Sequence, residues 1–189
     1  MKVLLTYAIE AEKGAITMPD HNVTLCCTGI GKVQSALAVS EAIMTERPDL
    51  VLNIGSCGSV RHPIGDILLC ARFMDRDLQK VAIPEIPYEL DFFEEIREAG
   101  LLPGYNLHHT VSTGDSFVVH TDDLADEADV VDMETFAIAC ACKRYNVPFL
   151  SVKYVTDIVG QNSVRSWAEK LSDACNGLAA FIGTIRLKA

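Results

Sequence analysis

Short apolar runs alternate with longer amphipathic segments along most of this chain. In the segment 35–47 apolar residues recur with helical spacing, which predicts a helix that ends before Pro48. Leu50–Ile54 is nearly all apolar, as expected of a strand buried on both faces of a parallel sheet. The other predicted strands are Lys2–Tyr7, Val23–Cys27, Ile67–Ala71, Val130–Val131 and Phe149–Val155, with His108–Thr113 and Phe117–Val119 flanking a Gly-Asp turn. The predicted helices are Ser35–Arg47, Tyr88–Ala99, Thr135–Tyr145 and Ser163–Ile185.

Strands that alternate with helices predict an α/β fold with a central mixed β-sheet flanked by helices. No repeat or linker divides the chain, and 189 residues suit one core, so residues 1–189 are expected to form a single domain. Ligands of such folds bind beyond the carboxyl ends of the strands. The loops expected there are rich in glycines, acids and hydroxyls, and they are 8–12, 28–32, 55–59, 113–117, 132–135 and 156–161.

The composition narrows the class of partner. Hydrophobic residues make up 49% of the chain and charged residues 22%, which is typical of a globular protein. The formal net charge of -10 disfavours nucleic acids and anionic membranes, because both would be repelled. No apolar run approaches the ~20 residues that a membrane span needs, and 1–7 is interpreted as a first strand and not as a signal peptide. The composition therefore argues against nucleic-acid and membrane partners.

The cysteines and histidines give no metal-binding pattern. Seven cysteines are scattered without a C-x-x-C pair, which favours reduced thiols in a cytoplasmic protein. His108 and His109 are adjacent, and on a strand they would point to opposite faces. The spacing of the possible ligands therefore predicts no metal site.

Two acidic residues follow apolar stretches that resemble buried strands. Glu134 follows 130–133, and Asp157 ends the stretch 147–156. Burying an unpaired charge is costly, so both are candidates for ligand binding or for general-acid chemistry. Each also has a structural explanation, since Glu134 would suit the first turn of the following helix and Asp157 would suit a turn cap. Glu12, which follows the first strand, is by itself interpreted as a solvated residue.

Three glycine-containing loops are candidate ligand sites. The segment 28–32 fails the spacing of both a P-loop and a dinucleotide fingerprint, so a tight turn is preferred there. The glycines of 55–59 either form a simple turn or let a flat ligand approach the backbone. In 113–117, Asp115 is interpreted as a turn cap, and Phe117 either fills core or stacks on a ring, with core favoured locally.

Taken together, six stretches resemble the nucleoside phosphorylase/nucleosidase superfamily, and most closely its bacterial 5′-methylthioadenosine/S-adenosylhomocysteine nucleosidases. They occur in the family's order and span nearly the whole chain. The matching stretches are Ala8–Glu12, Thr28–Val33, Asn53–Gly58, Thr113–Phe117, Val131–Glu134 and Asn146–Phe149, the last leading to Thr156 and Asp157. The resemblance implies a nucleoside phosphorylase-like fold and hydrolysis of the N-glycosidic bond of a purine nucleoside, without a cofactor.

The resemblance also implies roles for individual residues. Asp157 matches the family's general acid, which protonates N7 of the purine, and Glu12 matches the base that activates water. Glu134 matches the acid that binds the ribose hydroxyls. The implied substrate-binding residues are Glu134, Met133 beneath the sugar, Phe117 stacked on the purine, Val118 pairing through its backbone, Ser56, Cys57, Gly58, Ile9, Lys153 and Trp167 near the 5′ group. Two carboxylates on opposite sides of one sugar also follow the general logic of glycoside hydrolysis.

The sequence departs from the family in three places. The segment 75–87 is abbreviated, Lys153 stands where these nucleosidases usually have arginine, and the phosphate loop of the phosphorylases is absent after the first strand. The 5′ group and the base of the substrate therefore stay open, with a phosphorolytic enzyme and a non-catalytic nucleoside-binding protein as alternatives. Family members usually form homodimers, and 75–88 is a candidate interface.

Overall fold

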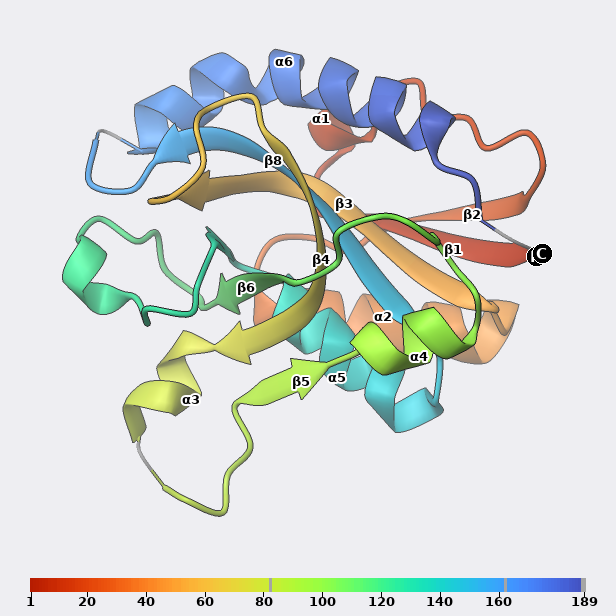
Figure 1. Ribbon diagram of the computed structural model, residues 1–189, viewed down its shortest axis with the longest axis horizontal. Helices are drawn as coiled ribbons and strands as arrows, with labels where there is room; N and C mark the ends of the chain where they lie inside the picture. The colour runs from red at the N-terminus through yellow and green to blue at the C-terminus, as the bar shows by residue number, and fades with distance from the viewer. Residues whose placement is uncertain (82, 162, 188–189) are drawn as a thin grey trace.

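The computed structural model describes residues 1–81, 83–161 and 163–187. Within these ranges a mixed sheet of eight strands carries the fold (Figure 1). The strands are β1 (Lys2–Tyr7), β2 (Asn22–Cys27), β3 (Leu50–Ser59), β4 (Ile67–Asp75), β5 (Glu89–Asp91), β6 (His109–Thr113), β7 (Val130–Asp132) and β8 (Phe149–Ile158). The helices are α1 (Glu10–Lys13), α2 (Lys32–Glu46), α3 (Arg76–Val81), α4 (Phe93–Glu98), α5 (Thr135–Tyr145) and α6 (Ser163–Thr184), with a 3-10 turn η1 at Thr121–Asp123.

The sheet closes on itself around the long central strands. β3 pairs in parallel with β1 and β8, and its end at Gly58 and Ser59 pairs antiparallel with β7. β8 pairs antiparallel with β4, which pairs in parallel with β6, and β6 pairs in parallel with β7. The five strands β3, β8, β4, β6 and β7 therefore form a ring, from which β1–β2 and β5 extend.

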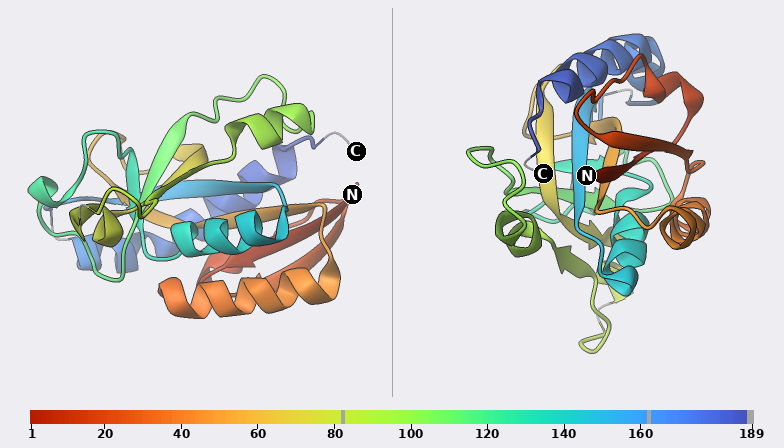
Figure 2. Two further views of the ribbon diagram at one scale, coloured as in Figure 1. Left: turned by 90° about the horizontal axis from the view of Figure 1, so that it is seen from below. Right: turned by 90° about the vertical axis from the view of Figure 1, so that its right-hand side faces the viewer.

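Helices lie on two opposite sides of the sheet, as the alternation of elements predicts. α6 lies along one side and contacts α1, β3 and β8, whereas α2 and α5 pack against each other on the opposite side (Figures 1 and 2). Phe73, Phe92 and Phe149 are all buried and meet in the core with ring centroids 4.7–6.1 Å apart. The expected α/β class with a mixed sheet and flanking helices is confirmed.

The expected loop at 55–59 is wrong, because β3 continues through it to Ser59. Glycine and serine have low strand propensity, but β8 pairs with β3 along nearly its whole length. In the same way β8 extends beyond the predicted Val155 and includes Asp157. The glycine-rich segment is therefore a rigid wall of the sheet and not a turn.

The predicted helix 88–99 and the predicted strand 117–119 are also wrong. The first half of 88–99 is strand β5, whose Asp91 forms an ion pair with Arg72 of β4 at 3.2 Å, and only Phe93–Glu98 is helical. Pairing with the sheet edge overrides local helix propensity here. Residues 117–119 have no regular structure.

Two short helices had no clear sequence signal. α1 has four residues and α3 has six, which is less than the spacing of apolar residues can reveal. Both matter for the site, because α1 carries Glu12 and α3 begins with Arg76. Among the described residues, no helix is long and apolar enough to cross a membrane.

Candidate active site

A single cavity collects side chains from distant parts of the chain. It lies where the ends of β1, β3, β7 and β8 meet the loop after β6 and the first turns of α6. Every residue that the resemblance assigned to a site lines it: Ile9, Glu12, Ser56, Cys57, Gly58, Phe117, Val118, Met133, Glu134, Lys153, Asp157 and Trp167. The structure thus brings together residues that are up to 158 positions apart in the chain, from 9 to 167.

Glu12 is buried, with 4% of its surface exposed, so its local interpretation as a solvated residue is wrong. One carboxylate oxygen accepts hydrogen bonds from the Ser56 backbone N–H at 2.9 Å and from the Ser56 hydroxyl at 2.7 Å. The other accepts from the Ala8 N–H at 3.2 Å. Three donors therefore hold this carboxylate at the cavity wall as an acceptor, because α1 folds it back against β3.

Ser56 connects Glu12 to the aromatic side of the cavity. Its hydroxyl, which donates to Glu12, also accepts a hydrogen bond from the Trp167 indole N–H at 2.9 Å. Trp167 in turn meets Phe117 edge-on, with ring centroids 6.3 Å apart. Phe117 is 43% exposed, so the local expectation that it fills core is wrong. Two aromatic rings thus stand at the cavity and offer a flat ligand an apolar face.

Lys153 forms a buried ion pair with Asp132, whose carboxylate lies 3.0 Å from its Nζ, and both side chains are almost inaccessible to solvent. Asp132 also accepts hydrogen bonds from the Thr113 hydroxyl at 2.6 Å, from the Thr135 N–H at 3.0 Å and from the Thr135 hydroxyl. Burial lowers the pKa of Lys153, but the nearby acids Asp132 and Glu134 raise it overall, so the side chain is a cation. Sequence reasoning saw Asp132 as a neighbour of the candidate acid and missed its part in the site.

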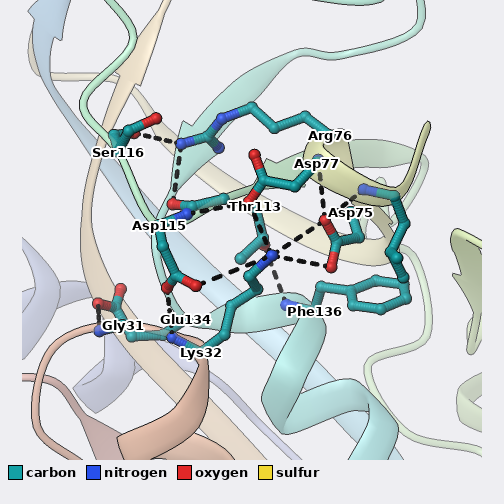
Figure 3. Close-up of polar contacts among 12 residues, drawn as sticks. Gly31, Lys32, Asp75, Arg76, Asp77, Thr113, Asp115, Ser116, Glu134 and Phe136 are labelled. Atoms are coloured by element: carbon teal, nitrogen blue, oxygen red, sulfur yellow. Dashed lines mark hydrogen bonds and ion pairs between the residues drawn. The ribbon is translucent and has the colours of Figure 1, made fainter. Parts of the chain in front are cut away.

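Glu134 lies at the N-cap position of α5, but its side chain makes no capping hydrogen bond. Its carboxylate instead accepts from the Gly31 N–H at 2.9 Å, which ties α5 to the start of α2 (Figure 3). Burial, reinforced by the charge of Asp132, raises the pKa of Glu134 to about 7, although Lys153 and the Gly31 N–H act in the opposite direction. A buried carboxyl that titrates near neutral pH is a feature of functional sites.

Asp157 lies within β8 and is 4% exposed. Its Oδ1 accepts a hydrogen bond from the Thr156 hydroxyl at 2.9 Å. A Cβ at Gly58 would lie 2.8 Å from Oδ2, so only glycine leaves this carboxylate its place beside β3. Glycine is needed at this position for close approach and not for a turn.

The loop 113–117 is fixed by a buried arginine that sequence reasoning missed. Arg76 donates to the backbone carbonyls of Ser112 at 2.7 Å, Asp132 at 3.0 Å, Gly114 at 2.9 Å and also Ser116. A Cβ at Gly114 would lie 2.7 Å from the guanidinium. Nothing in the local sequence marks this role, because all four partners are main-chain carbonyls.

A second lysine cluster lies near the start of α2 (Figure 3). The Lys32 ammonium contacts carboxylate oxygens of Asp75 at 3.1 Å and Asp77 at 2.7 Å, and one of Asp115 at 3.9 Å. Asp115 also accepts from the Lys32 N–H at 2.8 Å, so its expected role as a cap within its own turn is wrong. The cluster fastens the loop 113–117 to α2 and α3.

The cavity can therefore hold a ligand with an aromatic part against Phe117 and Trp167 and a polar part among the carboxylates. Glu12 and Asp157 lie on different elements and can serve two proton transfers, while Glu134 can accept hydrogen bonds from hydroxyls.

Comparison with known proteins agrees with this architecture. A sequence model of the phosphorylase superfamily matches residues 9–184. The chain is 28% identical over 173 residues to a 5′-methylthioadenosine/S-adenosylhomocysteine nucleosidase of Bacillus licheniformis, covering 80% of this chain and 75% of that protein. A nucleosidase of the same description from Colwellia psychrerythraea, solved with adenine, superposes with a TM-score of 0.78 at 24% identity over 97% of this chain and 93% of that one. The structure of a Helicobacter pylori mutant protein with 5′-methylthioadenosine in its active site superposes with a TM-score of 0.79 at 19% identity, and 96% of each chain is covered.

Proposed function

Since the chain belongs to the phosphorylase superfamily, we propose that it is a purine nucleosidase, an enzyme that hydrolyses the N-glycosidic bond of a purine nucleoside. The curated relatives are nucleosidases for 5′-methylthioadenosine and S-adenosylhomocysteine, so a 5′-modified adenosine is the proposed substrate. The observation that carries the proposal is the convergence of three acids, Glu12, Glu134 and Asp157, on one cavity with two aromatic rings.

In the proposed reaction Glu12 and Asp157 work from different sides of the sugar. Asp157 gives its proton to N7 of the purine as the C1′–N9 bond breaks and its electron pair moves into the base. Water attacks the cationic sugar carbon, and Glu12 accepts the proton that the water loses. The products are the free base and a free sugar, and no cofactor is needed. Buried carboxylates stabilise such a sugar cation better than hydrated ones.

The other cavity residues bind the nucleoside in this proposal. Glu134 accepts hydrogen bonds from the ribose hydroxyls, with Met133 beneath the sugar. Phe117 stacks on the purine, and the Val118 backbone pairs with it. Lys153 lies near the ribose, while Trp167 and Ile9 border the 5′ group. Ser56, Cys57 and Gly58 form the wall at the ribose and the base, which fits the position of β3 along the cavity.

Asp157→Asn tests the proposal. It removes the transferable proton and keeps the shape, so release of adenine from 5′-methylthioadenosine should fall by about 10²–10⁴-fold while equilibrium binding changes little. Chromatography of the products, with and without phosphate, gives the readout. Ribose-1-phosphate derivatives would show a phosphorolytic enzyme, and binding without base release in the unmutated protein would show a nucleoside-binding protein. Either outcome overturns the hydrolase.

We also propose that the protein is a homodimer. Val33, Leu37 and Met44 of α2 are each more than half exposed, as is Ile30 beside the cavity. The segment 75–88, expected at an interface, exposes Ile83 and Ile86. Apolar residues grouped in this way favour a protein partner, and a second copy would cover them. Sedimentation of the protein as a monomer at micromolar concentration would contradict this.

The proposed location is the cytoplasm. All seven cysteines are free thiols, and Cys57, Cys70 and Cys142 are buried, which suits a reducing compartment.

A further inference from the structure

Two histidines and an aspartate meet outside the cavity, although they are far apart in the sequence. His62 follows β3, His109 opens β6, and Asp129 directly precedes β7. One possible ligand atom from each lies within 4.8 Å of the other two. We propose that His62, His109 and Asp129 form a binding site for a divalent transition-metal ion of the Zn²⁺ class.

The distances are longer than a bound ion requires. His62 Nε2 lies 3.6 Å from one Asp129 oxygen, and His109 Nδ1 lies 3.9 Å from the other. Ligands at about 2.0–2.1 Å from a tetrahedral Zn²⁺ stand about 3.3 Å apart, whereas the three candidate atoms lie within 4.8 Å of one another, so the side chains must move closer together when an ion binds. Two imidazoles with one carboxylate are a common Zn²⁺ donor set that leaves a fourth position for water.

One ligand nitrogen has no other partner. Among the described residues, His62 Nε2 is shielded from solvent yet makes no hydrogen bond, although it faces Asp129. A buried ring nitrogen without a partner is costly, and a metal ion would satisfy it.

The atoms that face away from the site are supported, as in known metal centres. His62 Nδ1 lies 3.7 Å from an Asp66 carboxylate oxygen, and His109 Nε2 lies 3.3 Å from the Asn106 amide. The Asp129 oxygen that lies nearer His109 also accepts the Thr110 N–H at 2.8 Å, which orients the carboxylate. Partners of this kind orient ligating side chains and set their tautomers.

The backbone around the site is held in place by one hydroxyl. Ser59 Oγ donates to the Asp129 carbonyl at 2.6 Å and accepts from the N–H groups of Arg61 at 3.2 Å and His62 at 3.1 Å. The adjoining pair Gly58 and Val131 lines the nucleoside cavity. An ion here would clamp the ends of β3 and β7 that form one wall of the cavity, so its role is structural.

A simpler arrangement is possible without a metal. The Arg61 guanidinium lies 4.0 Å from an Asp129 oxygen and would balance the charge of the carboxylate by itself. That arrangement predicts no preference for Zn²⁺, so Zn²⁺ binding distinguishes the metal site from the metal-free ion pair.

Titration calorimetry with Zn²⁺ on chelator-treated, reduced protein is the first test. We expect a single saturable equivalent per chain and, at a hundredfold excess over Kd, a rise in Tm of roughly 5 °C or more. Mg²⁺ should give neither, because it prefers oxygen ligands. Absence of saturable Zn²⁺ binding, or equal binding of Mg²⁺, overturns the proposal.

Variants assign the site, because the seven thiols are alternative Zn²⁺ ligands. His62→Gln and His109→Gln should each weaken Zn²⁺ binding by about tenfold or more, whereas the exposed His120→Gln is the matched control. If a variant fails to fold, imidazole NMR signals of the unmutated protein replace it. Zn²⁺ must then shift the signals of His62 and His109 and leave that of His120, and the reverse pattern overturns the proposal.

Discussion

Two lysines, Lys153 and Lys32, each face three carboxylates, and the two clusters behave in opposite ways. Lys153 faces Asp132, Glu134 and Glu12 and is 2% exposed, whereas Lys32 has a side chain that is 20% exposed. Around Lys153 burial raises the pKa of Glu134. Around Lys32 burial also acts to raise the pKa of Asp77, but the hydrogen bonds from the Lys32 ammonium and the Asp115 N–H, together with the charges of Lys32 and Arg76, outweigh burial, and the pKa is lowered.

Exposure to solvent, more than the number of charges, therefore determines whether such a cluster is suited to chemistry or to positioning. Water reaches Lys32, Asp77 and Asp115, so their charges are screened and the cluster fastens the loop 113–117 to α2 and α3. Water is excluded around Lys153, so the excess negative charge falls on Glu134, which holds a proton up to neutral pH. The buried cluster is therefore suited to chemistry and the outer one to positioning.

Lys153→Met should have the largest effect on stability. It leaves Asp132 buried without its cation, which costs about 3–5 kcal/mol of unfolding free energy. Urea denaturation measures the loss. Lys153→Arg keeps the charge and is the matched control. Its loss of unfolding free energy should be smaller, because the neighbouring residue is Gly55. A Cβ there would lie 3.2 Å from the Lys153 Nζ, so the glycine leaves room for the larger guanidinium. If Lys153→Met were as stable as the unmutated protein, the proposed difference between the buried Lys153 cluster and the outer Lys32 cluster would be wrong.

Glu134→Gln should stabilise the protein, but only at higher pH. The pKa of Glu134 is raised from 4.5 to about 7 on folding, so the folded state binds more protons between these values and stability falls as pH rises through them. The cost is complete above pH 7 and absent below pH 4.5. The variant should gain about 1–3 kcal/mol at pH 8 and nothing at pH 4, measured by urea denaturation.

The same change should impair the proposed reaction. Loss of a charged acceptor for the ribose hydroxyls should lower kcat/KM by about 10- to 100-fold. Glu127→Gln, at an exposed glutamate, is the control for both measurements. A stability gain that does not depend on pH would contradict the assignment of the raised pKa to Glu134.

Lys32→Met should have the smallest effect, about 1 kcal/mol, because Lys32 and two of its three partners, Asp77 and Asp115, are partly hydrated. The loss should shrink in 1 M salt, where the Debye length is about 3 Å. Lys170→Met, which breaks the exposed pair with Asp173, is the control and should change the unfolding free energy little. A loss as large as that of Lys153→Met, unaffected by salt, would show that both clusters are effectively buried.

The local pattern predicted elements well where one face or both faces of a segment are apolar. β1, β2 and α5 begin and end within a residue of their predicted bounds. It failed at β5 and at the second half of β3, where pairing with a distant strand stabilises residues of low strand propensity. It also missed α1, which is too short to show a period.

For the candidate site, the family resemblance identified twelve residues that all line the cavity, whereas local chemistry alone did not, and both approaches missed Asp132 and Arg76, which line it too. Local reasoning placed Glu12 at the surface, and Arg76 had no signal at all. Their burial depends on β3 closing over α1 and on four carbonyls converging on one guanidinium. Neither contact is visible within a few residues of sequence.

The α/β class, most of the strands and helices, and the residue types capable of acid and base chemistry follow from the amino-acid sequence, because these depend on periodicity and on side-chain identity. Which acids lose their water, and which lysine each one faces, depends on the folded arrangement. Desolvation and charge pairing act between segments that only the folded sheet brings together, so the raised pKa of Glu134 and the convergence of His62, His109 and Asp129 could be seen only in the fold.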